Sequence, residues 1–303
     1  MGRPLRFLPD GALVEITCRT VQGRLLLRPS PHLNELVLGV LGRAQARYGM
    51  VLHAFVVLSN HLHLLLSPGS PRQLARFMAF VGANVAKEAG RLHDWKGPFW
   101  ARRYQAIVVS DEEPAQVGRL FYILRHGVKE HLVARPQDWP GAHAVTALLE
   151  GSPLTGLWID RTLEHRLRRK CGEPDPRSWR SIESVVLSPL PCWRDLPRDA
   201  YRARVAELVA EVEAEGTRLA EEKGEPLGRD RVQRQQPHER PMSSKHSPAP
   251  FVHAACRAVR LAFLEAYRLF VVAFRGAADR LRAGDRFAVF PDGAFPPPLP
   301  TSG

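Results

Sequence analysis

The sequence has few cysteines and no pair with the spacing of a zinc or redox motif. The four cysteines, among 303 residues, are Cys18, Cys171, Cys192 and Cys256. Their wide separation rules out a Cys-x-x-Cys site and a dense disulfide framework. It predicts ordinary buried or free thiols in a reducing compartment.

Long apolar runs are also missing. No run approaches the roughly 20 residues that a membrane-spanning helix needs. The apolar stretch 269–274 is bracketed by Arg268 and Arg275. Residues 1–10 show no apolar core of a secretory signal. We therefore expect a soluble cytoplasmic protein without a membrane partner.

The charge balance, by contrast, is strongly positive. Lys and Arg number 43 against 31 Asp and Glu, which gives a net charge of +12. Most of the excess is Arg, which suits bidentate phosphate contacts better than Lys. The composition indicates a polyanionic partner, most often a nucleic acid, although charge can also serve solubility alone.

The hydrophobic pattern of residues 1–150 predicts a mixed α/β domain. The expected strands are 12–21, 53–58, 62–66 and 105–109, with a turn at 59–60. The expected helices are 31–48, capped by Ser30, a second from Ser70, and 111–129 with a capping box of Ser110 and Glu113. The order β-α-β-β-α-β plus a helix predicts an α+β fold of ferredoxin-like type, an antiparallel four-stranded sheet with helices on one face.

The remainder of the chain divides by composition into three regions. Residues 151–222 are a basic, mixed and partly helical extension, with a strand at 184–187 and a charged helix at 199–222. Residues 223–250 are polar and Pro-rich, which predicts a linker or an extended basic arm. Residues 251–303 are expected to form a C-terminal helix and an extended tail.

Two histidines, His61 and His63, are embedded in an otherwise apolar segment. On a strand, residues i and i+2 share one face, so the two imidazoles would project side by side while Leu62 enters the core. Twelve histidines would give about half a His-x-His pair by chance, so the bare motif is weak. The apolar setting is what favours a metal site, because polar rings on a buried face need something to bind.

Tyr122 and His126 are four residues apart and would share one face of the helix after the fourth strand. Taken singly, Tyr122 could be a half-buried surface tyrosine and His126 a helix C-terminal histidine. Together with His61 and His63, they predict three imidazole ligands for one divalent ion beside a phenol nucleophile.

These residues resemble the REP-associated tyrosine transposases, a single-tyrosine group of the HUH nucleases. The resemblance is carried by Asn60–His63, Tyr122–Lys129, Val133, Pro136 and Trp139–Pro140, within residues 5–145. It implies a ferredoxin-like fold and a Mg²⁺ or Mn²⁺ site formed by His61, His63 and His126. It also implies that Tyr122 attacks single-stranded DNA and retains a 5′-phosphotyrosine. The third ligand of the family is often Gln or Asn, whereas this chain has His126, and an all-histidine site favours Mn²⁺ or another transition ion.

Basic side chains near aromatic ones predict a groove for single-stranded DNA. The candidate DNA-binding residues are Arg72, Arg76, Arg102, Arg103, Arg119 and Lys129. Trp95, Phe99 and Trp100 could stack on bases or could be core residues. Tyr104 competes with Tyr122 as nucleophile, although no ligand-type residue follows it one turn later.

The sequence thus predicts a metal-dependent, transposase-like nuclease and strand transferase that acts on single-stranded or hairpin DNA. The sequence does not decide whether the protein is a monomer or a homodimer. One alternative is a non-catalytic DNA-binding protein of the same fold. Another is a metal phosphoesterase that uses water instead of tyrosine.

Overall fold

A five-stranded, mostly antiparallel sheet forms the centre of the protein. The computed structural model describes residues 4–241 and 250–295. The main sheet has the order β2-β3-β1-β4-β7. Its strands are β1 (Leu13–Arg19), β2 (Val51–Leu58), β3 (His61–Ser67), β4 (Gln105–Val109) and β7 (Val252–His253). The first four are antiparallel to their neighbours in the order that the ferredoxin-like fold requires, so the predicted fold class is confirmed.

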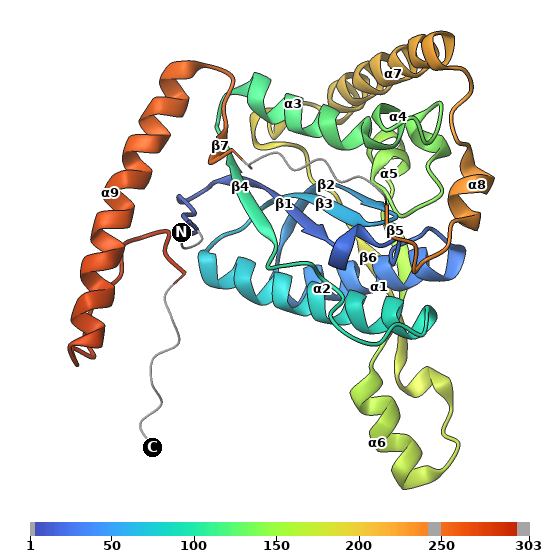
Figure 1. Cartoon of the computed structure of the whole chain (residues 1–303), viewed down its shortest axis with the longest axis horizontal. Coiled ribbons are helices and arrows are strands. Elements are labelled where there is room, and N and C mark those ends of the chain that lie inside the picture. The colour runs from blue at the N-terminus through green and yellow to red at the C-terminus, as the bar shows by residue number, and fades with distance from the viewer. Residues whose placement is uncertain (1–3, 242–249, 296–303) are drawn as a thin grey trace.

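The fifth strand was not predicted. β7 comes from the C-terminal region and pairs in parallel with β4, with Val252 beside Val108 and His253 beside Val109. The sheet is therefore extended at its β4 edge by a segment from a distant part of the sequence (Figure 1).

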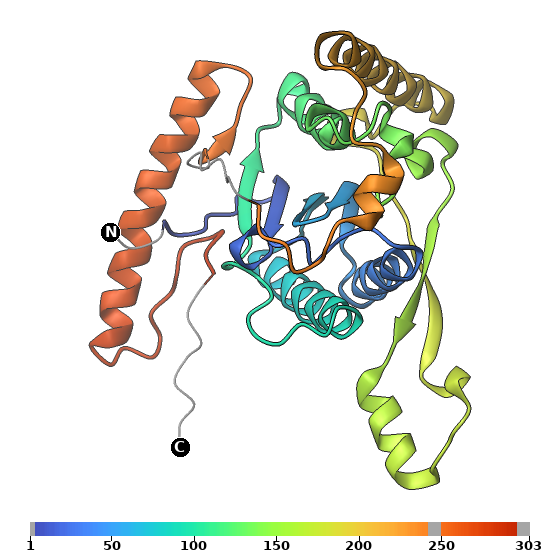
Figure 2. The same cartoon turned by 45° about the vertical axis from the view of Figure 1, so that its right-hand side comes forward.

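Two long helices cover one face of the sheet, and a third covers the other. α1 (Pro31–Tyr48) and α2 (Pro71–Leu92) lie below the sheet, and α3 (Glu113–Leu124) lies above it (Figures 1 and 2). The Ser30 hydroxyl accepts from the Leu33 amide at 3.2 Å, and the Ser70 hydroxyl accepts from the Gln73 amide at 3.1 Å. Both helices thus begin at N-caps of the kind that the sequence predicts.

Side chains along β3 alternate between the hydrophobic core on one face of the sheet and the predicted metal ligands on the other. Leu62 and Leu64 are fully buried on the α1/α2 side. His61 and His63 project to the opposite side, where Thr17 of β1 lies across from His63 and Arg19 across from His61. A polar row therefore crosses the sheet beneath α3.

The predicted helix over 111–129 is interrupted. α3 ends at Leu124, and a short helix, α4 (His126–Lys129), follows after Arg125. The predicted capping box is wrong: the N-cap position is Glu112, and the Ser110 hydroxyl instead donates to the Glu112 carboxylate at 2.8 Å. The break redirects the chain directly before His126.

The region after residue 144 wraps around this unit. Its elements are α5 (Val145–Glu150), β5 (Leu154–Ile159), α6 (Arg161–Cys171), β6 (Arg180–Val185), α7 (Arg198–Lys223), α8 (Arg229–Arg234) and α9 (Arg257–Arg282). Short 3-10 turns are η1 (Val21–Gly23), η2 (Pro136–Asp138), η3 (Pro176–Ser178) and η4 (Pro191–Trp193). The expected division at 150, 222 and 250 stays a prediction.

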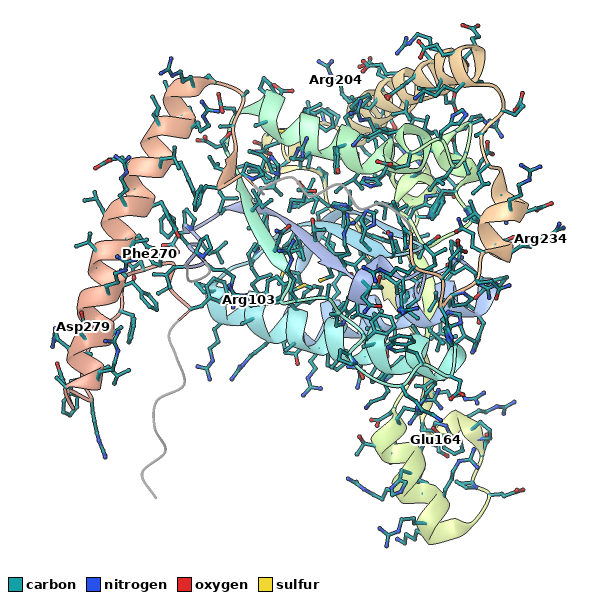
Figure 3. The ribbon with its side chains drawn as sticks, viewed as in Figure 1. Arg103, Glu164, Arg204, Arg234, Phe270 and Asp279 are labelled. Atoms are coloured by element: carbon teal, nitrogen blue, oxygen red, sulfur yellow. The ribbon has the colours of Figure 1, made fainter. Side chains whose placement is uncertain are left out.

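Three parts of this region have distinct positions. α7 packs against α3 and α4, and the β5–β6 hairpin packs against α1. Figure 3 shows Arg204 on α7 above the sheet and Glu164 on α6 at the opposite end of the molecule. Within the predicted linker 223–250, residues 229–234 are helical, and Lys245 of the expected basic arm lies outside the described residues, as do residues 296–303 of the predicted extended tail. No helix in the described ranges is long and apolar enough to cross a bilayer.

The contact between the hairpin and α1 gives a prediction about stability. A Cβ on Gly39 of α1 would lie 2.1 Å from the backbone carbonyl of Leu157 in β5. Gly39→Ala is therefore expected to lower the free energy of unfolding by about 3 kcal/mol, because backbone cannot yield as a side chain can. Urea denaturation measures the change. Gly276→Ala in α9, where a Cβ meets nothing within 4 Å, is the matched control, and an equal effect in both variants would contradict the prediction.

Candidate metal and nucleophile site

A cavity of about 640 Å³ lies between the sheet and the α3–α4 segment. Its walls combine β1, β3 and β4 with α3, α4 and residues of the C-terminal region. The chemically distinctive residues that line it are Glu15, Thr17, Arg19, Asn60, His61, His63, Arg119, Tyr122, His126, Lys129 and His253. The predicted nucleophile and the three predicted ligands therefore share one cavity.

The three predicted ligands form one cluster. His61, His63 and His126 are buried, and their nearest ring nitrogens all lie within 4.8 Å of one another. Nε2 of His61 is 3.0 Å from Nε2 of His126. The ring centroids of His63 and His126 are 4.8 Å apart. The structure thus brings together side chains that are 65 positions apart in sequence.

Hydrogen bonds at Nδ1 orient the rings of His61 and His63 and leave Nε2 of each ring without such a partner on its own strand or on β1. The Asn60 side-chain oxygen lies 2.6 Å from Nδ1 of His61, and a Glu15 carboxylate oxygen lies 2.9 Å from Nδ1 of His63. An acceptor at Nδ1 selects the tautomer with the proton on Nδ1, which leaves the Nε2 lone pair for a ligand. This is the outer-shell arrangement that supports histidine ligands in metal sites.

Burial keeps His61 and His126 in the neutral state that can bind a metal ion. Removal from water, followed by the positive charge of neighbouring groups, lowers the pKa of His61 and of His126 well below the usual value for histidine. Neutral imidazoles present lone pairs, and two lone pairs at 3.0 Å repel unless a proton or a cation lies between them.

These residues fit a divalent ion. Two nitrogens each about 2.1 Å from one ion lie about 3 Å apart when the bond angle is about 90°, and the His61–His126 separation is 3.0 Å. Nδ1 of His126 is buried without a hydrogen-bond partner among the described residues, so the ring is not held by a competing contact. Three imidazoles suit a transition ion better than Mg²⁺.

Tyr122 lies against this cluster. Its ring centroid is 5.0 Å from that of His126 and 5.5 Å from that of His63, with both pairs edge to face. The Arg119 guanidinium is 4.6 Å from the centre of the Tyr122 ring, and the Lys129 ammonium is 5.0 Å from it. Burial and then the charge of Glu15 raise the pKa of Tyr122, while Arg119 opposes them. The resting phenol is therefore protonated.

Glu15 connects the cluster to two other elements. Its carboxylate is 3.4 Å from Nη1 of Arg119 on α3 and 3.0 Å from Nε2 of His253 on β7. The alignment at His253 falls outside that of a regular hydrogen bond. Burial alone would raise the pKa of Glu15, but the imidazoles of His253 and His63 outweigh it and hold the pKa well below its usual range. A buried carboxylate thus supports His63.

Glu15→Gln is expected to weaken metal binding by about 10- to 100-fold, the usual cost of losing an outer-shell partner of a histidine ligand. The amide keeps the shape of the side chain but removes the charge that favours the Nδ1–H tautomer of His63. Calorimetric titration with Mn²⁺ measures the change. Glu265→Gln on the exposed face of α9 is the control, and wild-type affinity in Glu15→Gln would remove Glu15 from the site.

The predicted DNA-binding residues fall into three groups. Arg119 and Lys129 line the cavity beside Tyr122. Arg102 and Arg103 are exposed at the start of β4 and line a neighbouring cavity instead. Arg72 and Arg76 are exposed on α2, across the sheet from the histidine cluster (Figure 1). The structure therefore gathers only the first group at the cluster.

The remaining aromatic candidates are held by other contacts. Phe99 is buried, and the Trp100 indole donates to the Gly82 carbonyl at 2.8 Å. The Trp95 indole donates to the Pro98 carbonyl at 3.1 Å. Tyr104 lies under the Arg6 guanidinium, 4.7 Å from the ring centre, and does not line the cavity of the three histidines. Burial raises the pKa of Tyr104, as it raises that of Tyr122, so position rather than acidity separates the two tyrosines.

Sequence reasoning missed Glu15, Thr17 and His253. Glu15 carried a usable signal, since a charged residue between Val14 and Ile16 in a strand is costly unless it is paired. Thr17 is 3.2 Å from Nδ1 of His63, a contact that depends on strand register. His253 carried no local signal, because its position depends on the pairing of β7 with β4.

Comparison with solved structures gives several similarities, of which two transposase structures are examples. No protein-family model matches the chain, and none of the curated proteins matches it in sequence. One similar structure is a REP-associated tyrosine transposase bound to a REP hairpin, at 16% identity over 50% of this chain and 86% of the other, with a TM-score of 0.42.

The second similar structure is a putative transposase from Deinococcus radiodurans R1. It has 17% identity over 40% of this chain and 95% of the other, with a TM-score of 0.29. The function proposed below rests on the geometry of the site rather than on these similarities.

Proposed function

We propose that this protein is a metal-dependent endonuclease and strand transferase of the transposase type, which cuts single-stranded or hairpin DNA through a phosphotyrosine intermediate. The observation that carries the proposal is the contact of the Tyr122 ring with two imidazoles of a buried three-histidine cluster. Arg119 and Lys129 at the same ring supply positive charge for a phosphodiester.

The proposed cleavage is a displacement at phosphorus. The Tyr122 oxygen forms a bond to the scissile phosphorus as the bond to the 3′ oxygen breaks. The phenol releases its proton and the departing 3′ oxygen takes one up, so a 5′-phosphotyrosine and a free 3′-OH result. A divalent ion held by His61, His63 and His126 would supply Lewis-acid polarisation of the phosphate. Attack by a 3′-OH on the phosphotyrosine reverses the step and joins strands.

The surrounding residues have supporting roles in this step. Arg119 and Lys129 compensate the negative charge that gathers on the phosphate and on the phenolate. Asn60 and Glu15 hold the rings of His61 and His63 in position. Because the cavity is confined between the sheet and α3, the substrate must be a strand that can bend into it.

A covalent adduct is the direct test of the proposal. Wild-type protein is incubated with Mn²⁺ and a hairpin carrying a 3′-end label, and the products are separated under denaturing conditions. We expect labelled DNA to migrate with the protein, since the strand 3′ to the cut keeps the phosphotyrosine. Cleavage without an adduct would indicate a phosphoesterase that uses water. Binding without cleavage would indicate a non-catalytic DNA-binding protein.

The form of the DNA should also matter for affinity. We expect anisotropy titration to show tighter binding to a hairpin with a single-stranded flank and to an unstructured strand than to a blunt duplex. The difference should grow as salt rises, because general phosphate contacts weaken steeply with salt. Equal affinity for all three DNAs at two salt concentrations would favour a general DNA-coating protein.

A further inference from the structure

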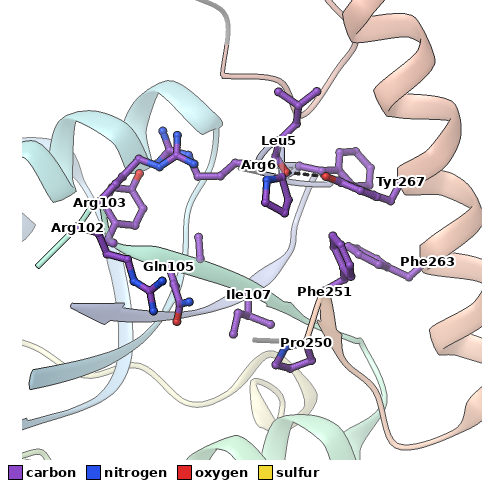
Figure 4. A pocket seen from close by; sticks show the side chains of 14 residues that line it. Leu5, Arg6, Arg102, Arg103, Gln105, Ile107, Pro250, Phe251, Phe263 and Tyr267 are labelled. Carbon is purple, nitrogen blue, oxygen red and sulfur yellow. Dashed lines mark hydrogen bonds between the residues drawn. The ribbon is translucent and has the colours of Figure 1, made fainter. Parts of the chain in front are cut away.

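A second cavity, of about 220 Å³, lies beside the first. It is bounded by the N-terminal segment 4–7, by residues 102–107 at the start of β4, by Pro250 and Phe251 before β7, and by Phe263 and Tyr267 of α9. In Figure 4, Arg102 and Gln105 lie on one side of the hollow, and Phe251 and Phe263 lie on the other.

The two cavities adjoin along β4. Gln105, Ile107 and Pro250 line both of them. Gln105 lies opposite Thr17 in β1, and Ile107 lies opposite Glu15, so both belong to the row of residues that borders the histidine cluster. A strand whose phosphate lies at Tyr122 can therefore continue into the second cavity.

One wall of the second cavity is aromatic. The ring centroids of Phe251 and Tyr267 are 5.0 Å apart, and Phe251 remains 47% exposed. The Tyr267 hydroxyl donates to the Leu5 carbonyl at 3.1 Å, which fixes that ring at the wall (Figure 4). An exposed ring beside a fixed one offers a surface on which a flat base can stack.

The other wall is cationic and holds unpaired donors. Nε and Nη1 of Arg6 are buried without hydrogen-bond partners among the described residues. The Arg6 guanidinium lies 4.7 Å from the Tyr104 ring centre and 4.1 Å from the Phe295 ring centre. Arg102 and Arg103 are exposed nearby, and no acidic side chain of the described chain lines the cavity. Since these two nitrogens are covered, a phosphate would meet Arg6 at the part of its side chain that lines the cavity, where the charges of Arg6, Arg102 and Arg103 favour an anion.

We propose that this second cavity binds one nucleotide of the single-stranded DNA, next to the cleaved phosphate. The base stacks on Phe251, Arg6 contacts the phosphate, and Gln105 faces the edge of the base. The volume is below the roughly 300–1,000 Å³ of pockets for drug-sized ligands, so the cavity holds no more than one nucleotide. The proposal rests on the nuclease function above and gives α9 a role in binding the substrate.

Abasic scanning of the DNA tests this site without cleavage. The full-length Tyr122→Phe protein is titrated with hairpins whose flank lacks one base at a time. At one position, loss of the base should weaken binding by about 5- to 150-fold, the contribution of one stacked base. Adding Phe251→Ala should abolish this position dependence. Phe287→Ala, an 88% exposed phenylalanine outside the cavity, should preserve it.

A second variant tests the phosphate contact. Arg6→Gln should reduce the slope of log affinity against log salt by about 0.7, the value for one phosphate on a single strand. Arg260→Gln on the exposed side of α9 should lower the slope less. An unchanged slope in Arg6→Gln would overturn the assignment of Arg6.

The outcomes separate this proposal from the nuclease function. A flat abasic scan, or an unchanged scan after Phe251→Ala, would overturn the nucleotide site even if the wild type forms the covalent adduct. The opposite result is also informative. If no adduct forms but the abasic scan depends on position and Phe251→Ala abolishes that dependence, the nuclease function is overturned and the nucleotide site is kept. Absence of any binding to the strand would overturn both.

Discussion

The Tyr122→Phe variant is expected to form no covalent adduct while it binds the same DNA with wild-type affinity. The substitution removes only the attacking oxygen. The ring keeps its edge contacts with His63 and His126, so the histidine cluster is not disturbed. Loss of a covalent nucleophile removes the reaction path itself rather than a fraction of its rate. Denaturing electrophoresis of 3′-labelled hairpin measures the adduct, and anisotropy measures the affinity.

Tyr104→Phe is the matched control for this variant. Tyr104 is also partly buried and has a guanidinium over its ring, but it lies in the neighbouring cavity. Tyr104→Phe keeps the ring under Arg6 and removes only the hydroxyl, so adduct formation should stay intact. An adduct that persists in Tyr122→Phe and disappears in Tyr104→Phe would show that the nucleophile has been assigned to the wrong tyrosine.

The second large effect concerns the metal. The double variant His61→Ala, His63→Ala is expected to lose Mn²⁺ binding by more than about 100-fold, since even an outer-shell partner is worth 10- to 100-fold. Two of three neutral nitrogen donors would be gone, and a single imidazole is a weak site. Isothermal calorimetry of the two proteins at the same pH measures the difference.

Two exposed histidines provide the control. The double variant His32→Ala, His165→Ala removes the same number of imidazoles from the surface, and it should bind Mn²⁺ as the wild type does. Near-ultraviolet circular dichroism checks that the first variant is folded. Wild-type affinity in a folded His61→Ala, His63→Ala protein would exclude the cluster as the metal site.

Features that depend on neighbouring residues, such as helix starts and the face on which a side chain lies, could be predicted from the sequence. Ser30 and Ser70 mark helix starts through bonds to amides three residues later, so α1 and α2 could be located from nearby residues. Strand alternation placed His61 and His63 together on one face. Helical spacing placed Tyr122 near His126, and the ring contact survives the break at Arg125.

Other features depend on residues that are distant in sequence. Nothing near Ser110 shows that its hydroxyl prefers the Glu112 carboxylate to a helix amide. Nothing near His253 shows that it meets Glu15, because that contact requires β7 to pair with β4. The second cavity could not be predicted from the sequence either, because its residues Arg6, Tyr104 and Tyr267 are far apart along the chain.

The pairing of β7 with β4 also sets the order in which the molecule can be completed during synthesis. The ribosome releases the N-terminal part of a chain first. The three histidines and Tyr122 therefore emerge long before Val252 and His253, and meanwhile β4 has an open edge with unpaired backbone groups. Of the partners of Glu15, His63 and Arg119 are synthesised in the first half of the chain, whereas His253 is added only near the end of translation. All the residues of the histidine cluster are thus synthesised before the strand that forms the wall beside it.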